Sequence, residues 1–133
     1  MLADPGGTNA VTSRIIGCAV RVHSAIGPGV YEQVYSECME YELRHNGFKF
    51  ESQRTFTITY RGVPLKARYY VDLVVEDLVV VELKAVSSLA EIHVRQVLTY
   101  LKLTGLPVGL LIKFNVPRLT DGVRRVIHPN PPG

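Results

Sequence analysis

Two periods of hydrophobic and polar residues divide the chain into helical and extended segments. Apolar residues recur at helical spacing over residues 12–25 and 30–45, and a Gly-Pro-Gly sequence at residues 27–29 interrupts the pattern between them. Gly47 follows the second segment, at the position where a left-handed residue commonly ends a helix. We therefore predict two consecutive helices near the N-terminus.

The middle of the chain follows the alternation of β-strands. Residues 48–60 alternate clearly toward their end, the pair Arg61-Gly62 predicts a tight turn, and residues 63–75 run back. Residues 78–85 form a third apolar run, joined to the second at Glu76-Asp77. These segments predict an antiparallel meander of three strands.

A third helix and a buried strand are expected to follow. Ser88 and Glu91 have the spacing of a capping box, and the helical pattern continues to residue 103 before Gly105 ends it. Residues 107–114 then predict a buried strand, whereas residues 115–126 fit a turn with either a short strand or a short helix. The order α-α-β-β-β-α-β predicts an α/β fold with a mixed central sheet, whose last strand lies parallel to an earlier one.

Composition indicates one folded domain with loose ends. The chain has 133 residues, of which 47% are hydrophobic and 20% charged, and this is enough to bury a substantial core. Residues 12–128 are assigned to a single domain. The small, polar residues 1–11 and the Pro-rich residues 129–133 are predicted to be flexible.

The sequence also bears on location. No secretory signal is evident, and acids interrupt the longest apolar stretch, residues 69–81, well short of the roughly 20 residues that span a bilayer, so we expect a soluble protein without a membrane partner. Cys18 and Cys38 lie in predicted helices without metal-ligand spacing. We interpret them as buried thiols of a cytoplasmic protein.

Net charge gives weak support for a nucleic-acid partner. The formal charge is +3, and basic residues gather in two places. The first group lies in the predicted early strands and the second near the C-terminus: Arg54, Arg61, Lys66, Arg68; Lys113, Arg118, Arg124, Arg125. From charge alone, solvated strand edges are the slightly better interpretation.

The best candidate for chemistry is Asp72 together with Glu82-Leu83-Lys84. Side chains alternate along a strand, so Glu82 and Lys84 share a face and hairpin pairing can bring Asp72 beside them. Mg²⁺ commonly takes one or two carboxylates, and the carbonyl of Leu83 could add another oxygen. Lys84 could orient a water or stabilise a phosphate. The alternative is an exposed Glu-Lys ion pair, which contributes under about 1 kcal/mol.

Two helical stripes extend this candidate site. Glu32 and Tyr35 share one face of the second helix, where Glu32 is either a third metal ligand or an acid stabilised by the helix dipole. His93, Gln96 and Tyr100 form a stripe on the later helix that could face a phosphate. Solvent exposure of His93 and Gln96 and a core-edge role for Tyr100 explain the stripe equally well.

Together these positions resemble the GxxExxY family within the PD-(D/E)xK nuclease superfamily. The resemblance spans about residues 15–127 and rests on three motifs: Gly29-Val30-Tyr31-Glu32-Gln33-Val34-Tyr35; Tyr70-Val71-Asp72 with Glu82-Leu83-Lys84; and Gln96-Val97-Leu98-Thr99-Tyr100, similar to the QxxxY element of RecB-type nucleases. Val71 departs from the pattern, since it stands where the superfamily name has proline.

The resemblance implies a restriction-endonuclease-like three-layer core and a Mg²⁺-dependent nuclease, with Mn²⁺ as a substitute and DNA as the expected substrate. It implies that Glu32, Asp72, Glu82 and Lys84 form the metal and catalytic cluster, which Gln96 and Tyr100 support from the later helix. We further predict that three residues bind substrate, namely Tyr35, His93 and Arg68.

Other functions remain compatible with the same fold. A non-catalytic module that binds nucleic acid or protein is the main alternative, and an accessory subunit of a larger complex or a toxin-like effector is another. A homodimer would supply two active sites for duplex cleavage, with the hairpin at residues 60–68 and the last strand as candidate contacts.

Overall fold

The computed structural model describes residues 7–130 as an α/β fold. Its helical elements are α1 (Thr8–Ile26), α2 (Glu32–His45), α3 (Glu91–Thr104) and the 3-10 helix η2 (Leu119–Gly122). Its strands are β1 (Phe50–Tyr60), β2 (Val63–Val75), β3 (Val79–Lys84), β4 (Val108–Lys113) and β5 (Val123–Ile127). None of the helices in this described part is long and apolar enough to cross a membrane.

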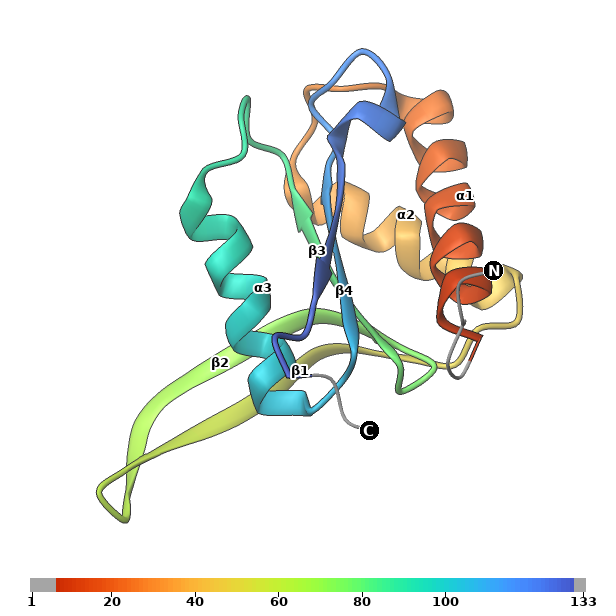
Figure 1. Cartoon of the computed structure of the whole chain (residues 1–133). Coiled ribbons are helices and arrows are strands. Elements are labelled where there is room, and N and C mark those ends of the chain that lie inside the picture. Colours follow the sequence, from red (N-terminus) through yellow and green to blue (C-terminus); the bar gives the residue numbers. More distant parts are fainter. Residues whose placement is uncertain (1–6, 131–133) are drawn as a thin grey trace.

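The five strands form one mixed sheet in the order β1-β2-β3-β4-β5. Neighbouring strands are antiparallel except β3 and β4, which are parallel and are connected through α3. Helices α1 and α2 cover one face and α3 covers the other (Figure 1). This arrangement confirms the predicted three-layer fold with a mixed central sheet, including the parallel pairing of the strand that follows α3.

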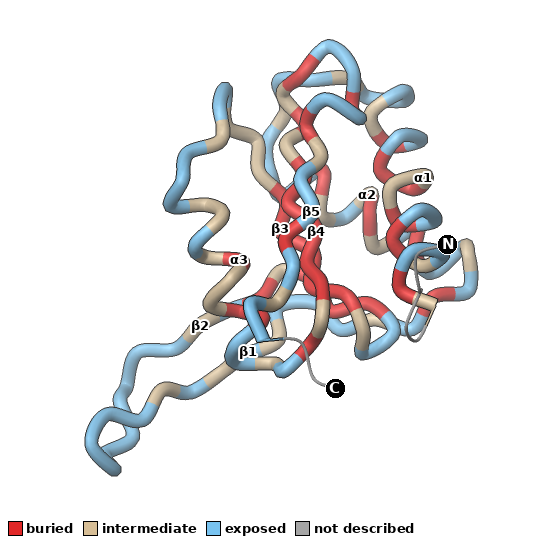
Figure 2. Tube along the Cα trace, viewed as in Figure 1, coloured by how far each residue is buried: buried red, intermediate tan, exposed pale blue. Residues whose placement is uncertain are grey.

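Two apolar clusters, one on each face of the sheet, hold the layers together. Val79, Val81 and Leu83 of β3 pack on the α1 and α2 side, whereas Val80 packs on the α3 side. Figure 2 shows β3 and β4 as largely buried. Strands that are covered on both faces have almost continuous apolar sequences, which explains the Val-rich sequence of β3. Within this run Glu82 is only 2% exposed, so an acid is buried in the centre of the sheet.

Helix α1 begins earlier than predicted. Thr8 to Val11 lie in the segment that we expected to be flexible, yet they form the first turn of α1. The guanidinium of Arg125 in β5 donates to Asn9 Oδ1 at 2.9 Å and to Thr12 Oγ1 at 2.6 Å. This contact between distant parts of the sequence anchors a turn that composition alone made look loose. Residues 1–6 and 131–133 lie outside the described range.

The predicted capping box at Ser88 is wrong. Helix α3 begins at Glu91 after Ala90, and the Nδ1 atom of His93 accepts the Ala90 N–H at 2.9 Å. A histidine on the first turn therefore accepts the backbone N–H of the residue that caps the helix.

The undecided segment at residues 115–126 contains both alternatives. The single turn η2 precedes β5, which pairs antiparallel with β4 at the edge of the sheet. Gly122 lies at their junction, where a Cβ atom would overlap the backbone carbonyl oxygen of Lys113. Only glycine permits this close approach of two backbone segments.

Replacing Gly122 by Ala is expected to lower the free energy of unfolding by about 3 kcal/mol, the upper end of the overpacking range, because backbone cannot rotate away from the added methyl group. Gly17→Ala is the matched control, since its Cβ would meet only Arg21 Nη1 at 3.8 Å. That change in α1 should stabilise the protein by up to about 1 kcal/mol. Urea unfolding of both variants measures the difference, and equal stabilities would contradict the prediction.

Candidate active site

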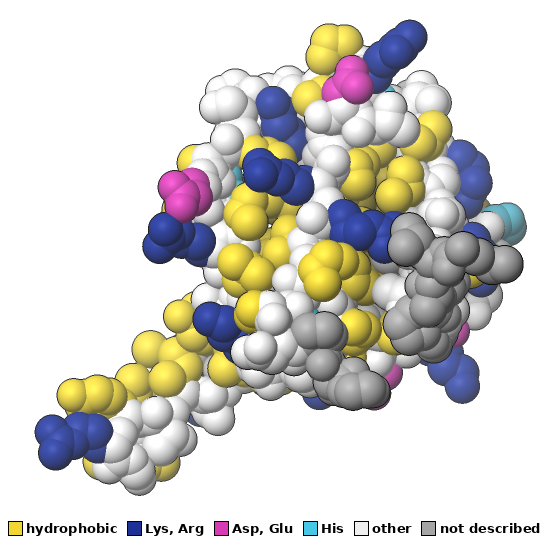
Figure 3. All heavy atoms as spheres, in the orientation of Figure 1, with side chains coloured by type: hydrophobic (Ala, Val, Ile, Leu, Met, Phe, Trp, Pro, Cys, Tyr) yellow, Lys and Arg dark blue, Asp and Glu magenta, His cyan; other side chains and the backbone are white. Residues whose placement is uncertain are grey.

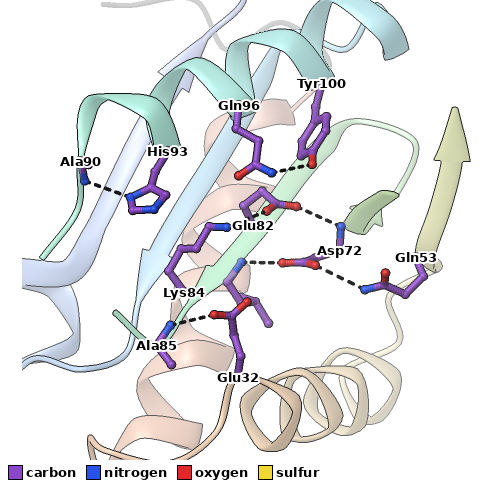
Figure 4. Close-up of polar contacts among 11 residues, drawn as sticks. Glu32, Gln53, Asp72, Glu82, Lys84, Ala85, Ala90, His93, Gln96 and Tyr100 are labelled. Carbon is purple, nitrogen blue, oxygen red and sulfur yellow. Dashed lines mark hydrogen bonds and ion pairs between the residues drawn. The ribbon is translucent and has the colours of Figure 1, made fainter. Parts of the chain in front are cut away.

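The candidate site lies where β2 and β3 stop pairing through their backbones. The ladder runs through Val75–Val79, Val74–Val80 and Leu73–Val81. At the next position the Asp72 backbone N–H donates to Glu82 Oε1 at 3.0 Å, and the Leu83 N–H donates to Asp72 Oδ2 at 2.9 Å (Figure 4). Two carboxylates thus replace the backbone acceptors where the strands diverge.

Lys84 joins this pair from the same face of β3 as Glu82. Its Nζ atom lies 3.8 Å from Glu82 Oε2, and the two side chains are only 16% and 3% exposed. Alternation of side chains along the strand turns both toward α3. The predicted exposed Glu-Lys pair is therefore excluded, because both groups are largely withdrawn from water.

Burial strongly affects the two acids. It raises the pKa of Glu82 to about 8, and the nearby charge of Asp72 adds to the shift. Burial also raises the pKa of Asp72, although hydrogen bonds from Leu83 and Gln53 and the charge of Lys84 oppose this. One lysine offsets only part of the repulsion between two desolvated carboxylates.

This pKa shift predicts a pH dependence of stability in metal-free protein. Between about pH 4.5 and pH 8 the folded state keeps a proton on Glu82 that the unfolded state has released. The free energy of unfolding should then fall as pH rises through this window, by at most about 1.4 kcal/mol per pH unit. Glu82→Gln cannot titrate, so its unfolding curves in EDTA should lack this component; an unchanged slope would contradict the prediction.

Helix α3 contributes Gln96 and Tyr100 to the opposite side of the site. Gln96 Nε2 donates to Tyr100 Oη at 2.9 Å, and the tyrosine ring packs edge-on against Tyr69 at 5.8 Å between centroids. Burial and the charge of Glu82 raise the pKa of Tyr100 to about 12. The phenol therefore stays neutral at physiological pH, beside the buried acids.

Comparison with known proteins identifies the family. A family model described as the PD-(D/E)XK nuclease superfamily matches residues 9–126. The chain belongs to this superfamily. The crystal structure of SSO0001 superposes with a TM-score of 0.53 and 20% sequence identity over 90% of this chain and 66% of that chain, and this likeness supports the fold alone. The comparison with curated proteins finds no match.

Glu32 stands slightly apart from the other acids. Its Oε2 atom accepts the Ala85 N–H at 3.2 Å just after β3, which ties the start of α2 to the end of that strand. Within residues 7–130, no group of three or more His, Cys, Asp and Glu side chains is arranged to hold a metal ion. The structure thus does not assemble the three-carboxylate ligand set that we predicted from Glu32, Asp72 and Glu82.

A smaller oxygen set does fit a divalent cation. Nucleases of the PD-(D/E)XK superfamily typically use divalent metals. The Leu83 N–H points toward Asp72, and the C=O of a strand residue points to the same side as its N–H, so this carbonyl faces the region of the carboxylates. Asp72, Glu82 and Leu83 offer the few hard oxygens that Mg²⁺ needs, and a bound cation would favour release of the proton that burial keeps on Glu82.

The predicted substrate contact of Tyr35 is wrong. The side chain is fully buried, and its ring stacks on Phe114 with 4.2 Å between centroids. Its Oη donates to the Gly27 carbonyl at 2.7 Å and accepts the Val30 N–H at 3.4 Å. Tyr35 therefore holds the loop that precedes Glu32. The spacing of Glu32 and Tyr35 places the tyrosine where it stabilises this loop, not where it contacts substrate.

The other two predicted substrate residues occupy different surroundings. His93 lines a groove of about 420 Å³ together with Gln96, Ile92 and Tyr69, between α3 and β2. Arg68 is exposed on β2, four residues before Asp72 and outside the cluster. Thus His93 adjoins the site, whereas Arg68 does not contact it.

Gln53 is a site residue that sequence patterns did not reveal. Its Nε2 atom donates to Asp72 Oδ1 at 3.3 Å, and its backbone has a positive φ of 52°. An irregular strand residue produces this contact, and a glutamine in a polar stretch carries no signal of it. The structure also brings Lys113 of β4 into register with Lys84 of β3.

Proposed function

We propose that the protein is a divalent-metal-dependent nuclease that hydrolyses phosphodiester bonds in DNA, and that it belongs to the GxxExxY family within its superfamily. The observation that carries the proposal is the buried arrangement of Asp72, Glu82 and Lys84 at the point where β2 and β3 separate. A buried group of two acids and a lysine with raised carboxylate pKa values is typical of catalytic sites.

The residues have distinct proposed roles. Asp72, Glu82 and the Leu83 carbonyl would hold Mg²⁺, or Mn²⁺ in its place. When bound, the cation supplies Lewis-acid stabilisation of charge on the phosphate. The Lys84 ammonium orients the attacking water and stabilises the negative charge that develops on the phosphate oxygens.

Surrounding residues position this group. Glu32 fixes the end of β3 through the Ala85 N–H, and Gln53 orients Asp72. The neutral phenol of Tyr100, held by Gln96, borders the acids on the α3 side. The groove lined by His93 and Gln96 provides an approach for the nucleic acid.

Cleavage assays test the proposal. Purified protein should nick plasmid, single-stranded or branched DNA with Mg²⁺ or Mn²⁺ and not with EDTA. Asp72→Ala and Lys84→Ala proteins, prepared in parallel, exclude a contaminating nuclease. Equal cleavage by wild-type and both variants would contradict the assignment.

One observation favours a non-catalytic binding module instead. Both carboxylates accept backbone N–H groups, so they would stabilise the strand junction even without a reaction. Isothermal titration with Mn²⁺ separates the two functions. A binding module would fold, bind DNA and gain stability from the carboxylates. It would neither bind Mn²⁺ nor cleave any of these substrates.

A further inference from the structure

The distal part of the β1–β2 hairpin, residues 57–68, projects from the body of the protein (Figure 1). We call this segment the arm. All of its residues except Ile58 are exposed (Figure 2). Beyond the body it is a two-stranded ribbon, and such ribbons are marginally stable in water without a further packing partner. Its length and exposure therefore indicate a surface that contacts another molecule.

The arm carries positive charge without any acid. Arg61, Lys66 and Arg68 are exposed, and residues 52–71 contain neither Asp nor Glu. The structure gives none of these three cations an ion pair within residues 7–130, whereas Arg54 nearer the body lies 3.6 Å from Asp77. Three unneutralised cations on a ribbon with no acid match a polyanion.

Large side chains accompany the cations. Tyr60 and Tyr70, at the tip and at the base of the arm, are 63% and 54% exposed. Figure 3 shows hydrophobic side chains along the hairpin and Lys or Arg at its end. Interleaved cations and aromatic rings are typical of surfaces that contact phosphates and stack on bases or sugars.

The position of the arm relative to the candidate site strengthens the inference. Arg68 precedes Asp72 by four residues on β2, about 13 Å along a strand. Tyr69, at the base of the arm, also lines the groove that contains His93 and Gln96. A chain seated in that groove would continue onto the arm.

We propose that the arm, together with Tyr70 beside its base, binds the nucleic-acid substrate, with Arg61, Lys66 and Arg68 on phosphates and the two tyrosines, Tyr60 and Tyr70, on sugars or bases; this inference rests on the proposed nuclease function. A two-stranded ribbon also has the width that the roughly 12 Å major groove of DNA admits. Symmetric contact between the arms of two copies is disfavoured, because it would place like charges together.

Binding measured without cleavage tests the arm. The probes are a fluorescent 30-base-pair DNA duplex and its single strand, titrated by anisotropy in EDTA at several salt concentrations. The arm variant R61Q/K66Q/R68Q should bind at least about tenfold more weakly than wild type, and its salt dependence should be shallower by about 2–3 in log–log slope for the duplex. Tyr60→Ser with Tyr70→Ser should weaken single-strand binding.

The matched control is K49Q/R118Q/R124Q, which removes the same charge from exposed positions elsewhere on the described surface. The DNA affinity of this control should stay much closer to that of wild type than the affinity of the arm variant does. Equal losses in the two triple variants would overturn the inference. So would an arm variant that binds DNA normally but shifts from dimer to monomer in sedimentation, because the arm would then contact a second copy.

Different experimental results would contradict the nuclease function and the role of the arm. If wild type binds DNA through the arm but cleaves nothing, the nuclease function fails and the arm inference stands. If cleavage is metal-dependent and the arm variant retains wild-type affinity and KM, only the arm inference fails. Absence of DNA binding by wild type would overturn it as well.

Discussion

Replacing Lys84 by Met is expected to lower kcat for DNA cleavage about 10²–10³-fold while the protein stays folded, since one electrostatic contact to a developing negative charge contributes on this scale. The Lys84 side chain is only 16% exposed and lies 3.8 Å from Glu82. Met has a similar shape without the charge, so the loss would report on the ammonium group. Single-turnover cleavage under saturating metal measures the effect.

A matched control separates the position from the substitution. Lys102 is exposed on α3, and Lys102→Met makes the same chemical change away from the acids. It should leave kcat within about twofold of wild type, as expected for a surface change that touches no functional group. If Lys84→Met cleaves DNA at the wild-type rate, Lys84 has no catalytic role.

Replacing Asp72 by Asn should remove both metal binding and cleavage. The amide can keep an oxygen for the Leu83 N–H, so the strand junction is retained, but the negative charge for a cation is lost. A bound metal contributes several kcal/mol of transition-state stabilisation, which predicts a loss of about 10²–10⁴-fold in kcat. Thermal unfolding with and without Mn²⁺ gives a second readout, because only a metal-binding protein gains stability.

Asp121→Asn is the control for this change. Asp121 is exposed in η2, so its variant should cleave DNA and gain stability with Mn²⁺ as wild type does. An Asp72→Asn protein that still gains stability from Mn²⁺ would show that the cation binds elsewhere. Retention of cleavage would show that Asp72 is a structural residue of the junction.

Part of the candidate site could be predicted because strand geometry is local. Alternation placed Glu82 and Lys84 on one face, and the short turn after β2 brought Asp72 within hydrogen-bonding distance of Glu82 and Leu83. The contact from Gln53 could not be predicted in this way. It depends on an irregular residue with positive φ in β1, which side-chain alternation along the sequence does not predict.

Helical spacing correctly predicted which residues share a face of a helix, but it did not predict what those residues do. Glu32 and Tyr35 do share a side of α2, but the tyrosine is buried against Phe114, nearly eighty residues later in the chain. Periodicity cannot distinguish a residue that contacts substrate from one that supports the loop beneath a functional residue. The capping-box spacing of Ser88 and Glu91 was misleading in a similar way. The helix begins at Glu91, and the N–H of Ala90 donates to His93.

The sequence by itself determined the order of helices and strands up to β4, the mixed sheet and the pairing of two acids with a lysine, because hydrophobic periodicity and turn residues are local properties. Tertiary structure alone decided that Glu82 is buried, that Tyr35 faces the core, that α1 begins at Thr8 and that the β1–β2 arm projects without cover. Those features depend on which distant segments pack together. Burial also decided the charge state of the site, since removal from water raises the carboxylate pKa values.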